Sequence, residues 1–180
     1  MPERAAILGK LAKEREKLVE HYRAMPEADL SRPCTDSEVD GESPWCAKDH
    51  LAHLAMIERA FQGMIRRHVG GESNPVGFGG GSRDEVIARV HRNNQDNVEA
   101  HRDDDLDTLL KDLDAARTET LALLDELTDE QLASPLPGAP WADGTIGGVL
   151  ITNAYHEIQH QAWVDEGLSA AGGASATRSQ

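Results

Sequence analysis

Two histidines near the end of the chain are four residues apart, in the sequence His156-Glu157-Ile158-Gln159-His160. On a helix this spacing places both imidazoles on one face, about one turn apart, where they can bind the same metal ion. The string also has the form H-E-x-x-H, in which zinc proteases use the glutamate as a general base. The chemistry of such a site depends on the side chain that supplies the third ligand.

The rest of the chain does not fit a zinc protease. The extended protease motif needs a glycine three residues after the second histidine, and another histidine three residues later. This chain has Trp163 at the first of these positions and no histidine beyond His160. A glutamate ligand on a further helix would have to come from residues 161–180, which leave little room for one. The motif therefore predicts a metal site rather than a protease.

The two histidines fall on the apolar stripe of a predicted last helix. Thr145 can cap this helix, and the stripe comprises Ile146, Val149, Leu150, Asn153, His156, His160, Trp163 and Val164. Imidazoles that face a core without a partner cost roughly 1 to 3 kcal/mol each, which a bound metal or ligand would remove. The alternative is that both are hydrogen-bonded histidines at the edge of the helix, with no metal.

Four other histidines lie on predicted helices and can supply a third ligand: His50, His53, His68 and His101. Sequence spacing does not choose among them, because residues on different helices come together only in the tertiary structure.

Apolar periodicity predicts an all-α protein, a four-helix bundle with long crossover loops. The predicted helices span residues 2–25, 46–69, 82–127 with a bend at 103–105, and 145–167, and the loops between them include a glycine-rich segment at 70–82. Residues 1–168 are expected to form a single domain, and residues 169–180, without periodicity, a disordered C-terminal tail.

The segment Trp45-Cys46-Ala47-Lys48-Asp49-His50-Leu51-Ala52-His53-Leu54 resembles the W-x-x-x-D-x-x-x-H opening of the second helix in the DinB-like (DinB/YfiT-like) superfamily. The late H-x-x-x-H of that superfamily resembles His156 to His160. The superfamily is related to the N-terminal domains of mycothiol-dependent maleylpyruvate isomerases. The resemblance implies a four-helix bundle with a divalent metal ion, zinc or nickel, bound by His53, His156 and His160.

Three neutral imidazoles leave coordination positions open for water or substrate, as in catalytic zinc sites. The resemblance therefore implies a metal-dependent enzyme of the thiol S-transferase or hydrolase type, acting on a small organic molecule and using a low-molecular-weight thiol as cofactor in some branches. Two alternatives stay open: a module that binds or sequesters a small molecule without turnover, and a protein-interaction bundle without a functional metal.

Several other residues have both a chemical and a structural interpretation. Glu157 can be a hydrogen-bond acceptor near the metal or a general base, but a solvated charge is the simpler interpretation. Asp49 can orient His53 or act as an acid in the first turn of its helix. Cys46 can be a nucleophile, or a small residue at a helix start. The arginines that could bind the carboxylates of a thiol cofactor are Arg59, Arg66, Arg67 and Arg92, which we expect on the solvated surface.

The composition narrows the range of partners. The formal charge of -14 opposes nucleic acids and anionic membrane surfaces, so neither is expected as a partner. No signal peptide or membrane-spanning run is apparent, which predicts a cytoplasmic protein with Cys34 and Cys46 as free thiols. A second apolar strip on the last helix, formed by Ile151, Ala154 and Ile158, suggests homodimerisation.

Overall fold

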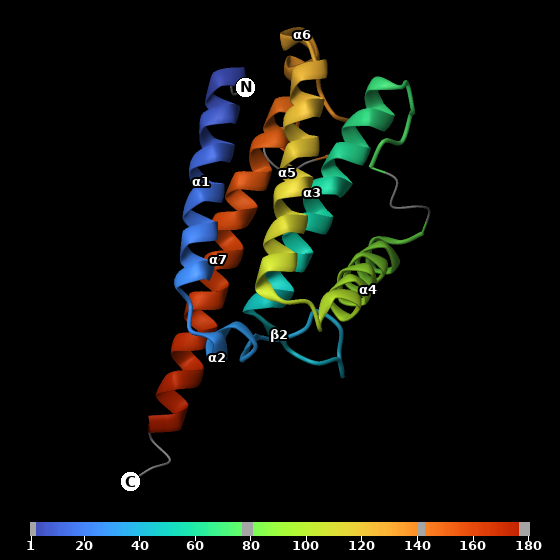
Figure 1. Cartoon of the computed structure of the whole chain (residues 1–180). Helices are drawn as coiled ribbons and strands as arrows, with labels where there is room; N and C mark the ends of the chain where they lie inside the picture. Colours follow the sequence, from blue (N-terminus) through green and yellow to red (C-terminus); the bar gives the residue numbers. More distant parts are fainter. Residues whose placement is uncertain (1–2, 77–80, 140–142, 177–180) are drawn as a thin grey trace.

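Four long helices form a bundle in the computed structural model of the chain, which describes residues 3–76, 81–139 and 143–176. They are α1 (Arg4–Ala24), α3 (Ala47–Val69), α5 (Leu106–Glu126) and α7 (Ile146–Ala176) (Figure 1). Helix α7 packs against α1 and α3, and α3 packs against α5. The predicted all-α four-helix bundle is confirmed.

The shorter elements close the two ends of the bundle. They are α2 (Glu27–Leu30), β1 (Pro33–Thr35), β2 (Trp45–Cys46) and α6 (Asp129–Ala133). β1 pairs antiparallel with β2 and also packs against α7. The loop predicted between the first two helices is therefore attached to the bundle, at the end where α3 begins.

The third helical region is two separate helices rather than one bent helix. α4 (Arg83–His101) packs against α3 outside the bundle (Figure 1), and α5 begins only after Asp105. The Asp105 carboxylate accepts a hydrogen bond from the Thr108 backbone amide at 2.7 Å, which caps α5 and ends the preceding turn. Residues 77–80 of the glycine-rich loop before α4 lie outside the described residues.

Two predicted helix caps are present. The Ser82 hydroxyl accepts a hydrogen bond from the Glu85 backbone amide at 3.3 Å at the start of α4. The Thr145 hydroxyl accepts one from the Gly148 amide at 3.0 Å at the start of α7. Each satisfies an amide that the first turn of a helix leaves without an intrahelical partner.

The last helix continues past Gly167, where the sequence predicts its end. A β-carbon at Gly167 would overlap with the carbonyl oxygen of Cys34, so this glycine allows β1 to approach the helix. Residues 169–176, predicted as disordered, are part of α7, and residues 177–180 lie outside the described residues. A glycine at a helix end and a glycine at a close contact look the same in a sequence.

The apolar core is divided into two clusters. One includes Ile7, Leu11, Met64, Ile65, Leu123, Leu124, Val149, Leu150 and Ala154. The other includes Leu18, Tyr22, Leu51, Leu54, Leu109, Leu113, Ala116 and Val164. Each of the four bundle helices contributes to both clusters. The segment of each helix between its two contributions therefore crosses the middle of the bundle.

The strip predicted to mediate dimerisation is mostly inside the protein. Ala154 is fully buried in the first cluster, Ile151 packs against that cluster, and Ile158 is 40% exposed. This strip therefore does not support homodimerisation, which stays a prediction. Within the described segments, no helix is both long and apolar enough to cross a bilayer.

Candidate metal centre

The structure brings His53, His156 and His160 together between α3 and α7. One ring nitrogen of each lies within 4.8 Å of the other two, and the Nε2 atoms of His156 and His160 are 2.9 Å apart. Zinc–nitrogen bonds of about 2.0 to 2.1 Å place tetrahedral ligands about 3.3 Å from one another. Small side-chain adjustments would therefore allow all three imidazoles to bind one ion.

Burial keeps these imidazoles neutral. His53 and His160 are only 5% and 3% exposed. Desolvation lowers the pKa of His53 to about 3 and that of His156 to about 4, and it lowers the pKa of His160 further. A neutral imidazole carries the lone pair that binds a metal, so the site has the required protonation state at pH 7.

One nitrogen of the cluster has no hydrogen-bond partner. Nδ1 of His53 is buried and unpaired within the described part of the protein. Buried polar atoms without a partner are uncommon, because each costs roughly 1 to 3 kcal/mol. Together with the all-nitrogen donor set, this atom shows that the residues fit a divalent metal ion.

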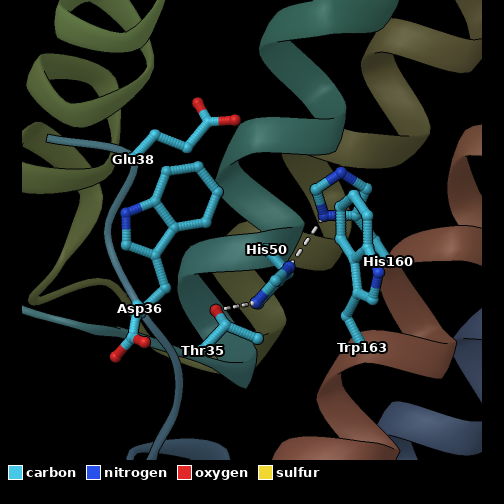
Figure 2. Close-up of a pocket in the computed structure, with 7 residues that line it drawn as sticks. Thr35, Asp36, Glu38, His50, His160 and Trp163 are labelled. Atoms are coloured by element: carbon cyan, nitrogen blue, oxygen red, sulfur yellow. Dashed lines mark hydrogen bonds between the residues drawn. The ribbon is translucent and has the colours of Figure 1, made fainter.

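A fourth histidine, His50, supports the cluster from outside. Its Nδ1 lies 2.7 Å from Nδ1 of His160, and its Nε2 lies 2.9 Å from the Thr35 hydroxyl (Figure 2). Of the four histidines that sequence spacing left open as third ligands, His53 is the one in the cluster. The supporting role of His50 had only one signal in the sequence: it lies three residues before His53, on the same side of α3.

Two indole rings enclose the histidines. The Trp45 ring centroid lies 5.2 Å from that of His53, and the Trp163 centroid lies 4.8 Å from that of His160. The Trp45 Nε1–H donates a hydrogen bond to Gln95 Oε1 at 3.0 Å. Gln95 belongs to α4, so the helix outside the bundle fixes one wall of the site.

A pocket of about 300 Å³ opens beside the histidines. Its lining residues are Thr35, Asp36, Glu38, Trp45, His50, His160 and Trp163. Figure 2 shows Asp36 and Glu38 on one side, His160 and Trp163 of α7 on the other, and His50 between them. A small molecule in this pocket would contact one histidine of the cluster directly.

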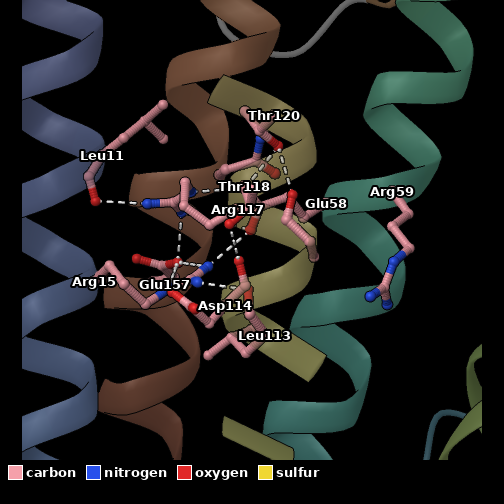
Figure 3. A network of polar contacts seen from close by, with 12 residues as sticks. Leu11, Arg15, Glu58, Arg59, Leu113, Asp114, Arg117, Thr118, Thr120 and Glu157 are labelled. Atoms are coloured by element: carbon pink, nitrogen blue, oxygen red, sulfur yellow. Dashed lines mark hydrogen bonds and ion pairs between the residues drawn. The ribbon is translucent and has the colours of Figure 1, made fainter. Parts of the chain in front are cut away.

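Glu157, between the two α7 histidines, is not a solvated charge. It is 2% exposed, and its Oε1 accepts hydrogen bonds from Arg15 and Arg117, each at 2.8 Å (Figure 3). The same two arginines donate to Glu58 on α3, both at 2.7 Å. The simpler interpretation from the sequence is therefore wrong, because the sequence does not reveal the two arginines that face this carboxylate.

These four charged residues form one buried network that contacts all four bundle helices. Arg15 also donates to the Leu113 carbonyl and Arg117 to the Leu11 carbonyl, each at 2.6 Å. The network lies between the two apolar clusters along each helix. It sets the position of α3 relative to α7, and these helices carry His53 and His156.

Cys46 and Asp49 have structural roles at the start of α3. Asp49 accepts a hydrogen bond from the Cys46 backbone amide at 2.8 Å, as an acid of the first helical turn. Burial raises the pKa of the Cys46 thiol, and burial raises that of Cys34 to about 12. Both cysteines are free thiols, as predicted, and neither has the lowered pKa of a nucleophilic cysteine.

The arginines considered for a thiol cofactor lie away from the histidines. Arg59 pairs with Asp112, Arg66 with Glu126, and Arg92 with Glu42, with nitrogen–oxygen distances of 2.7 to 2.8 Å. Arg67 donates to the Pro75 carbonyl at 2.8 Å. These partners agree with the predicted surface positions, and none of these four arginines lines the pocket.

Comparisons with known proteins agree with this architecture. The sequence profile described as the DinB superfamily matches residues 42–164. An uncharacterised protein from Escherichia coli UTI89 has a similar crystal structure, with a TM-score of 0.68, 14% identity and 94% of each chain covered. At that identity the likeness shows the fold alone. No curated protein matches the chain.

Proposed function

The chain belongs to the DinB superfamily, and we propose that it is a metal-dependent enzyme that acts on a small organic molecule. The observation that carries the proposal is the cluster of three neutral, buried imidazoles of His53, His156 and His160, next to an open pocket. Zinc or nickel is the proposed metal, and thiol S-transfer or hydrolysis is the proposed type of reaction.

The proposed roles follow from the position of each residue. His53, His156 and His160 would hold a divalent metal ion, which would supply Lewis acidity towards a water or thiol nucleophile. His160 faces both the cluster and the pocket, so the reacting group of the substrate would lie near it. The two indoles limit access of water to the histidines, and the Thr35–His50 pair holds the His160 ring in place.

One observation favours binding without turnover as a second candidate. Glu157, the carboxylate next to His156 in sequence, pairs with Arg15 and Arg117 in the buried network and does not line the pocket, so it is not placed to accept a proton from a substrate there. A pocket that binds its ligand through the metal and releases it unchanged would need no general base.

Metal analysis of protein purified without a histidine tag tests the proposal. Wild-type protein should contain about one equivalent of zinc or nickel, whereas His156→Ala should contain none. His101→Ala is the matched control, because His101 pairs with Asp104 at 2.8 Å, outside the cluster, and should leave the metal content unchanged. Wild-type protein without stoichiometric metal would refute the proposed function.

Turnover separates the enzyme from the binding module. Metal-loaded and chelator-treated protein are incubated with electrophiles plus a low-molecular-weight thiol, and with hydrolysable esters and amides. Product formation that depends on the metal and is lost in His156→Ala supports the enzyme. Metal-dependent binding of these compounds with no product supports the binding module.

A further inference from the structure

The pocket beside the histidines has an unusual set of walls. Its two largest lining side chains are the indoles of Trp45 and Trp163, and its acidic residues are Asp36 and Glu38. Among the described residues, none that lines it is a lysine or an arginine. Aromatic faces and carboxylates are the two kinds of group that attract an organic cation in proteins.

The indoles are well placed to contact a ligand. Trp163 is 42% exposed at the pocket and lies over His160, with its ring edge-to-face to the imidazole. Trp45 is 5% exposed and fixed by its hydrogen bond to Gln95, so it is a rigid wall. A large indole exposed in a pocket of a charged protein is a surface that a ligand would cover.

The carboxylates are available as well. Asp36 has no ion-pair partner among the residues that the structure describes, and it follows β1 directly. Glu38 accepts a hydrogen bond from the Asn94 amide at 3.0 Å and lies 3.7 Å from His91, but half of its side chain is exposed. Both add to the field of a chain with a net charge of -14, which repels anions.

We propose that this pocket binds small organic ammonium compounds, and that the substrate belongs to this class. The ammonium group contacts the indoles and the carboxylates of Asp36 and Glu38. An uncharged polar group at the other end of the molecule faces His160. As an assignment of substrate class, the inference rests on the proposed function; as an assignment of ligand chemistry, it rests on the pocket walls alone.

The other classes of ligand fit these walls less well. An anionic ligand would meet two carboxylates, and the lining residues that the structure describes include no lysine or arginine to offset them. An uncharged ligand of the same shape would gain the contacts with the indoles but not the attraction to the carboxylates. Charge alone should therefore improve binding by about tenfold between molecules of equal size.

Three probes of nearly identical shape test the role of charge. They are choline, its uncharged isostere 3,3-dimethylbutan-1-ol, and the anion 3,3-dimethylbutanoate. Binding of each is measured by isothermal titration calorimetry at low salt, with metal-loaded and with chelator-treated protein. Choline should bind about tenfold more tightly than the uncharged isostere, and the anion should bind the chelator-treated protein most weakly.

Variants locate the effect in the pocket. Asp36→Asn/Glu38→Gln should bring the affinity for choline close to that for the uncharged isostere and leave the isostere unchanged. Trp163→Leu should weaken both, choline more. The control Asp125→Asn/Glu130→Gln removes the same charge from exposed positions at the α6 end of the bundle and should have little effect.

The possible failures are distinguishable. Equal affinity for choline and the uncharged isostere, or equal loss of affinity in the pocket and control variants, overturns the ammonium pocket, whatever the metal content. A choline preference in protein without stoichiometric metal supports the pocket and refutes the proposed metal-dependent function.

Discussion

Nδ1 of His160 lies 2.7 Å from Nδ1 of His50. One of the two must donate, and a single arrangement leaves Nε2 of His160 with a free lone pair: His160 donates to His50, and His50 Nε2–H donates to the Thr35 hydroxyl at 2.9 Å. His50 therefore selects the tautomer of His160 that can bind a metal through the nitrogen facing His156. Such partners orient a ligand and raise its basicity.

His50→Phe should weaken metal binding without abolishing it. The phenyl ring keeps the packing against Trp45 but removes the acceptor for His160, so we expect an affinity about 10- to 100-fold lower. Thr35→Val removes only the hydroxyl that accepts the hydrogen bond from His50, so it should have a smaller effect on the metal affinity. Competition with a chromophoric chelator measures both affinities.

Two other histidine substitutions are the controls for the metal affinity of His50→Phe. His53→Ala removes a proposed ligand and should lose stoichiometric binding, whereas His68→Ala, outside the cluster, should bind as the wild type does. An affinity in His50→Phe equal to the wild-type value would show that the contact with His160 does not support the metal.

The metal-free protein should lose stability as the pH falls below about 6.5. Burial lowers the pKa of His50 and His156 to about 4 and that of His53 to about 3, whereas all three titrate near 6.5 in the unfolded chain. The unfolded state therefore binds more protons between these values. The free energy of unfolding is therefore not reduced by these histidines above pH 6.5, and it declines as the pH falls towards 3 to 4.

Urea unfolding at several pH values measures this dependence. His53→Phe should show a shallower decline between pH 6.5 and 4, because one of the groups that must stay neutral is gone. Bound metal competes with protons and should move the decline to lower pH. The same decline in His53→Phe and in the wild type would contradict the assignment to the histidines.

Glu157→Gln should destabilise the fold by about 3 to 5 kcal/mol. The substitution keeps the shape of the side chain but, among the described residues, leaves the guanidinium groups of Arg15 and Arg117 with Glu58 as their remaining carboxylate. Urea unfolding measures the change. The exposed substitution Glu130→Gln should stay within about 0.5 kcal/mol of the wild type.

A charge-balanced double variant measures the coupling energy between Arg117 and Glu157. Arg117→Met/Glu157→Leu removes one charge of each sign, so it should cost less than the sum of the two single substitutions. Additive costs would mean that the two residues stabilise the bundle independently.

Gly167→Ala should destabilise the protein by roughly 1 to 3 kcal/mol and weaken binding in the pocket. The added methyl group would meet the Cys34 carbonyl and push β1, which precedes Asp36, away from α7. Gly9→Ala is the matched control within α1, because nothing lies within 4 Å of its β-carbon position. This control should stabilise the fold by about 0.5 to 1 kcal/mol, and both changes can be followed by thermal unfolding.

The helices and their ends could be predicted from local rules. Apolar spacing at three and four residues is a property of the helix itself, and the hydroxyls of Ser82 and Thr145 cap the first turns that follow them. The shared face of His156 and His160 has the same local origin. These features depend on residues within about one helical turn, so the sequence contains them.

The spacing of residues in the sequence does not identify the third histidine of the cluster. His50 and His53 lie on one side of the same helix, and resemblance to the DinB-like superfamily, rather than geometry, favoured His53 in advance. Only the packing of α3 against α7 decides that His53 joins the cluster and that His50 contacts the outer edge of His160. The exchange of these two roles would need α3 to turn by about 60° and to shift by about 4.5 Å, because the two histidines are three residues apart on the helix.

The sequence by itself determined the helices, the inward face of the last one and the pair of histidines on that face. The tertiary structure decided what surrounds them: Glu157 is locked by Arg15 from α1 and Arg117 from α5, and the pocket faces two indoles and two carboxylates. The physical reason is the separation along the chain between the residues that interact. Helix formation depends on neighbours in the chain, whereas the pKa of a histidine or the pairing of a carboxylate depends on side chains far away in sequence.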